Sequence, residues 1–401
     1  MHRHYLTLFM LVLLANCSTT SSVGPQYQSG GEGKKVVLVN TEPFDVSIGV
    51  FDAGLEDQTS YGEDGVWPEL RRAESMYMAV QLRDVLAKSG TYGAVRITPD
   101  LTSSSDLYIK SKIVKSNGED VAIQVKVIDS TGKTWISKKY SHRVKPITFN
   151  NPRNKDSKGA LKLDPYGVIY NKIASDIAKY IKRNVKSKKA NLINTVTDIR
   201  YAQNFSPEAY TDILSLSNNK YKLRGMPDAD DPMMIRIKNI QYRDQMFIDN
   251  MQTNYDGFAS EMSVSYKVWQ EQSFAESRAA REAASAAFWQ GVAGAVVLAA
   301  TVAAAGDCDS YACGRNTGIV GGSVAGALFS DSFRSSKAAK IHRDTLNEIS
   351  ASLDGSLSPS VIEMEDRTVT LTGTAEEQSA QWREILRKIY NAEMEQTKPL
   401  L

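Results

Sequence analysis

The chain has 401 residues, with 48 lysines and arginines against 46 aspartates and glutamates. A chain of this length has room for about two or three domains. Because the opposite charges nearly cancel, the protein has no global positive field, which argues against a nucleic-acid-binding protein.

The first seventeen residues have the order of an export signal. A short basic segment, residues 1–4, precedes an uncharged apolar run from Tyr5 to Leu14, and Leu14-Ala15-Asn16-Cys17 follows. This pattern resembles the signal of bacterial lipoproteins. The resemblance implies a signal peptide at 1–16, an acyl chain such as palmitate on Cys17, and a protein held by lipid at the periplasmic face of the outer membrane. An ordinary signal peptide and an uncleaved anchor are the alternatives, although the apolar run is short for a hydrocarbon core of about 30 Å.

Residues 17–34 are rich in Ser, Thr and Gly and indicate a flexible tether. Apart from Cys17, the chain contains only Cys308 and Cys313. In an oxidising compartment this even pair favours a disulfide that closes a short loop. Two reduced, buried thiols are the alternative, and the geometry of the loop decides between them.

Residues 35–189 have the pattern of one α/β domain. Apolar runs predict strands at 36–39, 46–50, 94–97, 107–113, 121–127 and 135–143. Helical spacing predicts a helix over 68–89 that stops at Gly90, and a second one after Asp164 and Pro165. Asn117-Gly118 predicts a hairpin turn, so the later strands form an antiparallel meander.

This order of elements, over 46–52, 73–90, 94–99 and 107–127, resembles the class of TolB N-terminal domains and curli-secretion lipoproteins. The resemblance implies a module for envelope assembly, in which 35–189 binds a protein partner of the envelope. A fold does not by itself give a function.

Motifs of catalysis and metal binding are absent from the sequence. His142 and His342 have no second ligand four residues away, and Gly132-Lys133-Thr134 lacks the earlier glycine of a phosphate-binding loop. The run Asp228–Asp231 precedes Pro232, which indicates a helix N-cap rather than a calcium loop. We therefore predict no enzyme, no catalytic residues, no metal and no cofactor.

Residues 190–282 have a helical pattern, with no proline between Pro232 and the end of the region. One continuous helix of about 70 residues would reach about 105 Å. Two or three packed helices, with a break near Gly257, are the alternative. From Ala283 to Gly306 the chain is uncharged, a length sufficient for a bilayer span, although the many alanines also allow packing between helices.

A glycine pattern follows within a predicted helical hairpin over 283–333. Glycines recur at spacings of four, which places them on one helix face where another backbone can approach closely, and two more lie on the preceding helix: Gly314, Gly318, Gly322 and Gly326, with Gly291 and Gly294. The segment resembles the glycine zippers of envelope proteins. The resemblance implies membrane insertion or a homo-oligomer formed through 283–330; a hairpin packed inside a soluble bundle is the alternative.

Residues 334–401 form a small α/β piece. We expect a helix over 338–353, strands at 361–364 and 368–371, and a final helix that starts at a capping box made by Thr374 and Glu377. The run from Arg367 to Ala375 with this helix resembles the BON domain, a family associated with envelope and phospholipid surfaces.

The sequence thus predicts an α+β protein: an N-terminal α/β domain with an antiparallel meander, a long helical region with a glycine-rich hairpin, and a small α/β piece. As a function it favours a non-catalytic envelope lipoprotein that anchors, scaffolds or helps to assemble a structure at the outer membrane. The alternative is a periplasmic binding or regulatory module that acts on cell-wall polymer or its synthases.

Overall fold

The computed structural model describes residues 42–55, 67–228, 230–302, 344–348, 351, 360–363 and 368–395. The signal peptide, Cys17, the tether and the expected strand 36–39 lie outside these residues. So do His342, Cys308, Cys313 and the glycines from Gly314 to Gly326.

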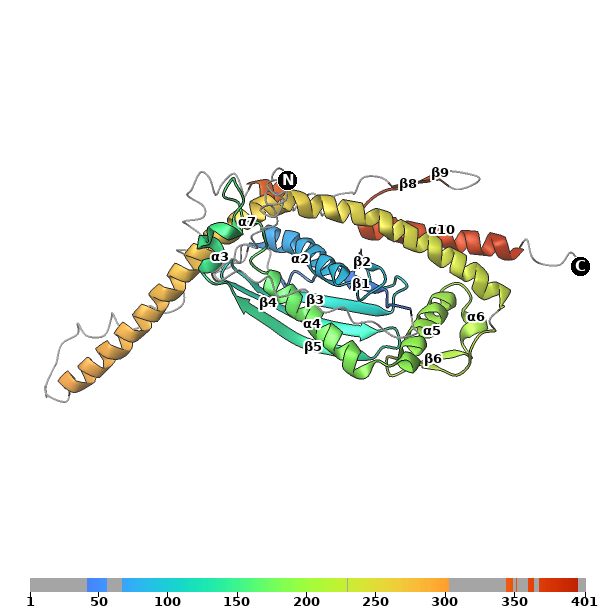
Figure 1. Ribbon diagram of the computed structural model, residues 1–401, viewed down its shortest axis with the longest axis horizontal. Helices are drawn as coiled ribbons and strands as arrows, with labels where there is room; N and C mark the ends of the chain where they lie inside the picture. Colours follow the sequence, from blue (N-terminus) through green and yellow to red (C-terminus); the bar gives the residue numbers. More distant parts are fainter. Residues whose placement is uncertain are drawn as a thin grey trace, which may run out of the picture.

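A five-stranded mixed sheet forms the base of the protein (Figure 1). Its order is β2-β1-β3-β4-β5: β1 pairs in parallel with β2 and β3, and β3, β4 and β5 form the antiparallel meander. The strands are β1 (Val46–Gly49), β2 (Val95–Thr98), β3 (Leu107–Ser116), β4 (Asp120–Asp129) and β5 (Thr134–Arg143). The sheet, the long helical region and the small C-terminal piece confirm the predicted mixture of α and β structure.

Two helices cover one face of this sheet, α2 (Pro68–Lys88) and α4 (Gly167–Asn184) (Figure 1). Their buried side chains, such as Leu82 and Ile173, join those of alternate strand residues such as Ile109 and Ile123 in one apolar core. The alternation along each strand has a period of two, so the other residues of β3, β4 and β5 face away from these helices.

The segment after α4 closes one end of the sheet. It contains α5 (Ser187–Gln203), α6 (Pro207–Tyr210) and a hairpin of β6 (Leu214–Ser217) and β7 (Lys220–Leu223). Two short helices, α3 (Ile147–Asn150) and η1 (Pro152–Asn154), come earlier in the chain, between β5 and α4. The region predicted as helical therefore also contains two strands. Asn218 and Asn219 have φ of 50° and 57°, the left-handed conformation that a two-residue hairpin turn requires.

One continuous helix, α7 (Pro232–Val302), has 71 residues and runs the length of the protein (Figure 1). Asp231 caps its start, since its Oδ1 accepts a hydrogen bond from the backbone N–H of Met233 at 2.9 Å. The helix passes through Gly257 without a break, which decides between the two readings of the sequence. None of the helices in the described part of the chain is long and apolar enough to cross a bilayer.

The C-terminal piece packs on α7. It contains a hairpin of β8 (Ser360–Glu363) and β9 (Thr368–Leu371) and then α10 (Ala375–Glu395). The capping box is confirmed: Thr374 N–H donates to the Glu377 carboxylate at 2.8 Å, and Glu377 N–H donates to the Thr374 hydroxyl at 3.2 Å. The Trp382 ring of α10 lies 5.4 Å from that of Phe247 on α7.

Candidate functional site

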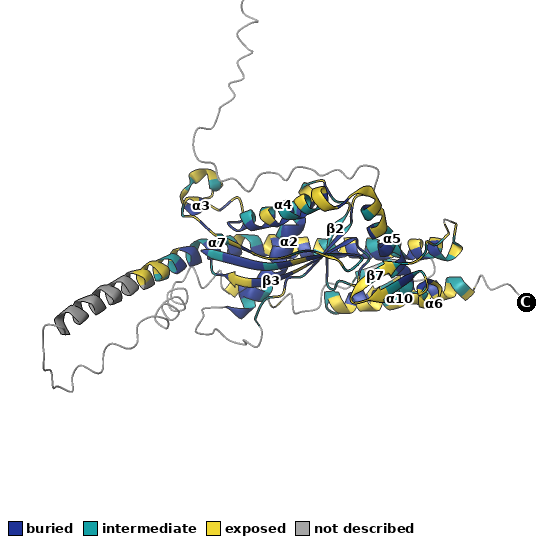
Figure 2. Ribbon diagram, turned by 90° about the horizontal axis from the view of Figure 1, so that it is seen from below, coloured by how far each residue is buried: buried dark blue, intermediate teal, exposed yellow. Residues whose placement is uncertain are grey.

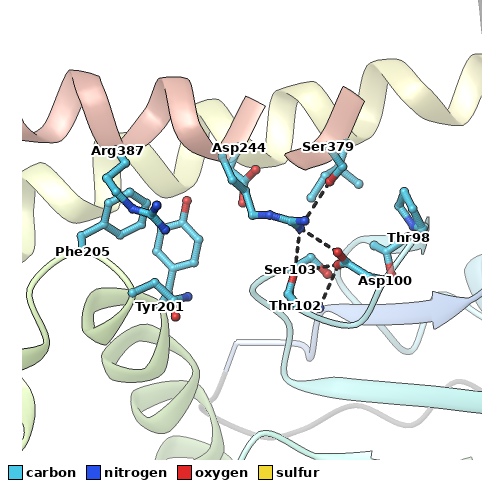
Figure 3. A pocket seen from close by; sticks show the side chains of 13 residues that line it. Thr98, Asp100, Thr102, Ser103, Tyr201, Phe205, Asp244, Ser379 and Arg387 are labelled. Carbon is cyan, nitrogen blue, oxygen red and sulfur yellow. Dashed lines mark hydrogen bonds and ion pairs between the residues drawn. The ribbon is translucent and has the colours of Figure 1, made fainter. Parts of the chain in front are cut away.

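A pocket of about 220 Å³ lies where four segments meet: the loop after β2, the end of α5, the first quarter of α7, and α10 (Figure 3). We call it the interface pocket. Its lining combines hydroxyl, amide, carboxyl and guanidinium groups with two aromatic rings, and consists of Thr98, Pro99, Asp100, Thr102, Ser103, Tyr201, Asn204, Phe205, Asp244, Ile248, Ser379, Arg383 and Arg387.

An ion pair fixes the loop after β2 to α10. Pro99 ends the strand, and the Asp100 carboxylate then accepts hydrogen bonds from the N–H of Thr102 at 3.0 Å and from its hydroxyl at 2.6 Å. Arg383 reaches Asp100 at 2.8 Å and donates to the Thr102 hydroxyl at 2.6 Å. Burial would raise the pKa of Asp100, but the hydrogen bonds from Thr102 and the Arg383 charge together lower it.

Asp244 is the buried acid of the pocket, with 7% of its surface exposed. Burial raises the pKa of its carboxyl to about 6, and the Tyr201 hydroxyl and the Arg383 charge only partly offset this. The hydroxyl of Thr98 is buried and has no hydrogen-bond partner in the described part of the chain, whereas the Tyr201 hydroxyl faces the Asp244 carboxyl. The pocket therefore contains one buried polar group, the Thr98 hydroxyl, that the described residues leave unsatisfied.

Arg387 lies at the exposed side of the pocket and extends toward Tyr201 and Phe205 (Figure 3). Across the described residues, no group of three or more His, Cys, Asp or Glu side chains could hold a metal ion. The arrangement can bind a small polar group by hydrogen bonds. It also couples α10 to α7 through side chains that the sequence did not single out.

A second polar cluster is fully buried and fixes α7 to the α/β body. Glu74 of α2 pairs with Arg71 at 3.0 Å and accepts a hydrogen bond from the Tyr266 hydroxyl of α7 at 2.7 Å. Asp164 accepts a hydrogen bond from Gln270 of α7 at 3.0 Å. Burial raises the pKa of both carboxyls despite these partners, so burying these groups costs folding free energy. The cluster nevertheless fixes the position of α7 on the α/β body.

The turn between β3 and β4 holds α7 at the point where the helix leaves the body. The Ser277 hydroxyl donates to the Asn117 carbonyl at 2.7 Å, and Arg281 makes a two-pronged ion pair with the buried Glu119, with contacts of 2.9 and 3.0 Å. Gly118 has φ of 80°, and a Cβ there would lie 2.5 Å from the backbone nitrogen of Phe274. The predicted Asn-Gly turn is thus also a docking point.

Of the site residues predicted from the sequence, the structure describes Gly291 and Gly294, and for these only the helical backbone. Both lie in the last turns of α7, which project beyond the body (Figure 1). His142 lies on β5, where burial and the charges of Lys172 and Lys145 lower its pKa. Comparisons of the chain with protein-family models, curated proteins and solved structures found no match.

Proposed function

We propose that this protein is a non-catalytic, lipid-anchored component of the bacterial cell envelope that acts as a scaffold or assembly factor. Its α/β body holds one long helix in a fixed position and presents the far end of that helix to an envelope protein or to a second copy of the chain. In this proposal Cys17 carries the lipid, and the body and α7 carry the partners.

The observation that carries the proposal is the division of α7 into two parts. From Met234 to Phe274 the helix has a buried side that belongs to the core, whereas residues 281–283 are exposed on a helix that continues to Val302 (Figure 2). Isolated helices in water are marginal, and most helical stability comes from packing of one face. A projecting stretch rich in alanine and glycine therefore favours a partner that packs against it.

The alternative, a binding module for cell-wall polymer, is favoured by the interface pocket. Its buried hydroxyls, its amide and its acid suit a ligand with many hydroxyl groups.

Crosslinking in the envelope tests the proposal. A photoreactive residue is placed in the projecting part of α7, at Ser285 or Phe288, and in a control at Leu192, an exposed site on the body. We expect specific adducts from the α7 positions, either with an envelope protein or at twice the mass of the chain, and none from Leu192. If labelling at the α7 positions matches that of the control, α7 is not the presenting element.

The lipid anchor has its own test. Cys17→Ser should release the protein to the soluble periplasm or stop its processing. If labelled fatty acid still enters this variant and its fractionation is unchanged, the anchor lies elsewhere.

A further inference from the structure

In the described part of the chain, the face of the sheet opposite α2 and α4 is exposed at its centre and rich in lysine. The register of β3, β4 and β5 places on this face the residues that alternate with the core positions. These are Tyr108, Lys110, Lys112, Lys115, Ala122, Gln124, Lys126, Ile128, Ser137, Lys139 and Ser141, of which Tyr108 and Ala122 are buried. At its centre, Lys110, Lys126 and Lys139 are all exposed. We call this set the lysine face.

The lysines are close neighbours. Lys110 pairs directly with Lys126 across β3 and β4, and Gln124 lies between Lys112 and Lys139 in the next row. Strands lie about 4.8 Å apart, and a step of two residues along a strand is about 7 Å. All four side chains therefore leave the sheet within an area of about 10 by 7 Å.

The acids among the described residues pair with Lys112 but not with the other three lysines. Asp120 is bound by Lys115 and Arg143, each at 2.7 Å. Asp52 accepts a hydrogen bond from Gly54 N–H at 2.8 Å and lies 4.0 Å from Lys112. Lys110, Lys126 and Lys139 have no ion pair with any described residue. Like charges directly opposite each other destabilise a sheet, so the pattern weakens the fold and calls for a binding explanation.

A hollow of about 490 Å³ adjoins the lysine face at the carboxyl ends of β1 and β2. Lys110, Lys112 and Lys126 line it on one side, and Gly49 and Leu101 on the other. Its two acids are Asp52 and Asp100, and Asp100 is already paired with Arg383 at 2.8 Å. The hollow keeps a positive charge and has room for an anionic group.

We propose that the lysine face binds the phosphate headgroups of an anionic bilayer. A protein partner would need apolar or aromatic anchors at the centre of its interface, whereas the centre of this face offers lysine, glutamine and serine. The proposal rests on the proposed function only in the choice of a membrane as partner. A lipid on Cys17 and a flexible tether would hold the face near the surface at a high effective concentration, so weak contacts would suffice.

Each lysine near an anionic surface contributes roughly a fivefold gain in membrane partitioning. Three lysines together should therefore contribute about a hundredfold, and this gain should fall steeply with salt because exposed charges are screened. The chain offers a matched control with the same change in net charge, since Lys172, Lys182 and Lys188 are exposed on α4 and α5, away from the lysine face.

The experiment uses the full mature chain with Cys17→Ser, so that no lipid anchor contributes and failure of the anchor prediction leaves the result intact. Sedimentation with phosphatidylcholine vesicles, with and without phosphatidylglycerol, compares this chain with two triple variants. They are Lys110→Gln/Lys126→Gln/Lys139→Gln and the control Lys172→Gln/Lys182→Gln/Lys188→Gln. We expect the first to lose about a hundredfold in binding to anionic vesicles and the control to lose less than about threefold.

A charge reversal separates binding from folding. Lys126→Glu places opposite charges across β3 and β4, so it should raise the midpoint of thermal unfolding while it weakens vesicle binding. Equal losses in the two triple variants would overturn the proposal, because binding would then follow net charge alone. Tighter binding to soluble poly-glutamate than to vesicles, or full competition by inorganic phosphate at low concentration, would also overturn it, in favour of an acidic polypeptide or free phosphate.

Discussion

Replacement of Gly118 by alanine should loosen α7 where it leaves the body. The structure separates the loss in unfolding free energy into a backbone contribution and a steric contribution. Gly118 has φ of 80°, a conformation that costs an alanine about 1–2 kcal/mol. The new Cβ would also lie 2.5 Å from the nitrogen of Phe274 and 2.7 Å from the carbonyl carbon of Ser273, both backbone atoms of α7. Relief of such overpacking costs about 1–3 kcal/mol more.

Gly159→Ala is the matched control. Gly159 has φ of 82°, and a Cβ there would meet no atom within 4 Å, so this substitution pays the conformational cost alone. We expect Gly159→Ala to lower the free energy of unfolding by about 1–2 kcal/mol and Gly118→Ala by about 2–5 kcal/mol.

Urea unfolding measures both values, and amide exchange across 270–281 shows whether α7 loosens. Displacement of this part of α7 would also separate Arg281 from Glu119, whose side chain is 4% exposed. Equal costs for the two substitutions, with unchanged exchange in α7, would refute the docking role of the turn.

Three further predictions address other parts of the chain. Burial raises the pKa of Asp244 to about 6, so the stability that its protonated carboxyl contributes is present below about pH 4 and is lost as the pH rises through 6. In urea unfolding between pH 4 and 8, Asp244→Asn should reduce the change in the free energy of unfolding with pH by about 2–3 kcal/mol. Gln252→Leu should cost about 1–3 kcal/mol and speed amide exchange at Ile97, because the Gln252 amide both donates to and accepts from the Ile97 backbone, each at 2.9 Å. Gly318→Leu should reduce crosslinked oligomers far more than Ser323→Leu does, and equal effects would remove the glycine-zipper interpretation.

Much of the α/β body could be predicted because its signals are local. The alternation of apolar residues located β3 and β4, Gly90 marked the end of α2 within two residues, and the box of Thr374 and Glu377 marked the start of α10. Each of these signals depends on neighbours in the sequence, so no knowledge of the tertiary fold was needed.

The hairpin of β6 and β7 was missed although its signal was present. Asn218-Asn219 stands between two short runs that alternate polar and apolar residues, which is a hairpin pattern. The helical pattern on both sides of it led to a helical assignment for the whole region.

The course of α7 and the interface pocket could not be predicted. Whether a long helical pattern continues or folds back depends on contacts such as that of Tyr266 with Glu74, which lie 192 positions apart. Similarly, Asp244 and Arg387 come together only because α7 and α10 pack side by side. No residue spacing within the sequence indicates that these side chains are close in space.

The projection of α7 makes it a mechanical lever. The part beyond Arg281 has roughly 21 residues and extends about 31 Å, whereas the longer part before it is held against the body. A tilt of a few degrees at Arg281 would move the far end by several ångströms. Contacts near Glu119 and Gly118 could therefore set the position of whatever is attached near Val302, and strain at the far end would be felt first at the turn between β3 and β4.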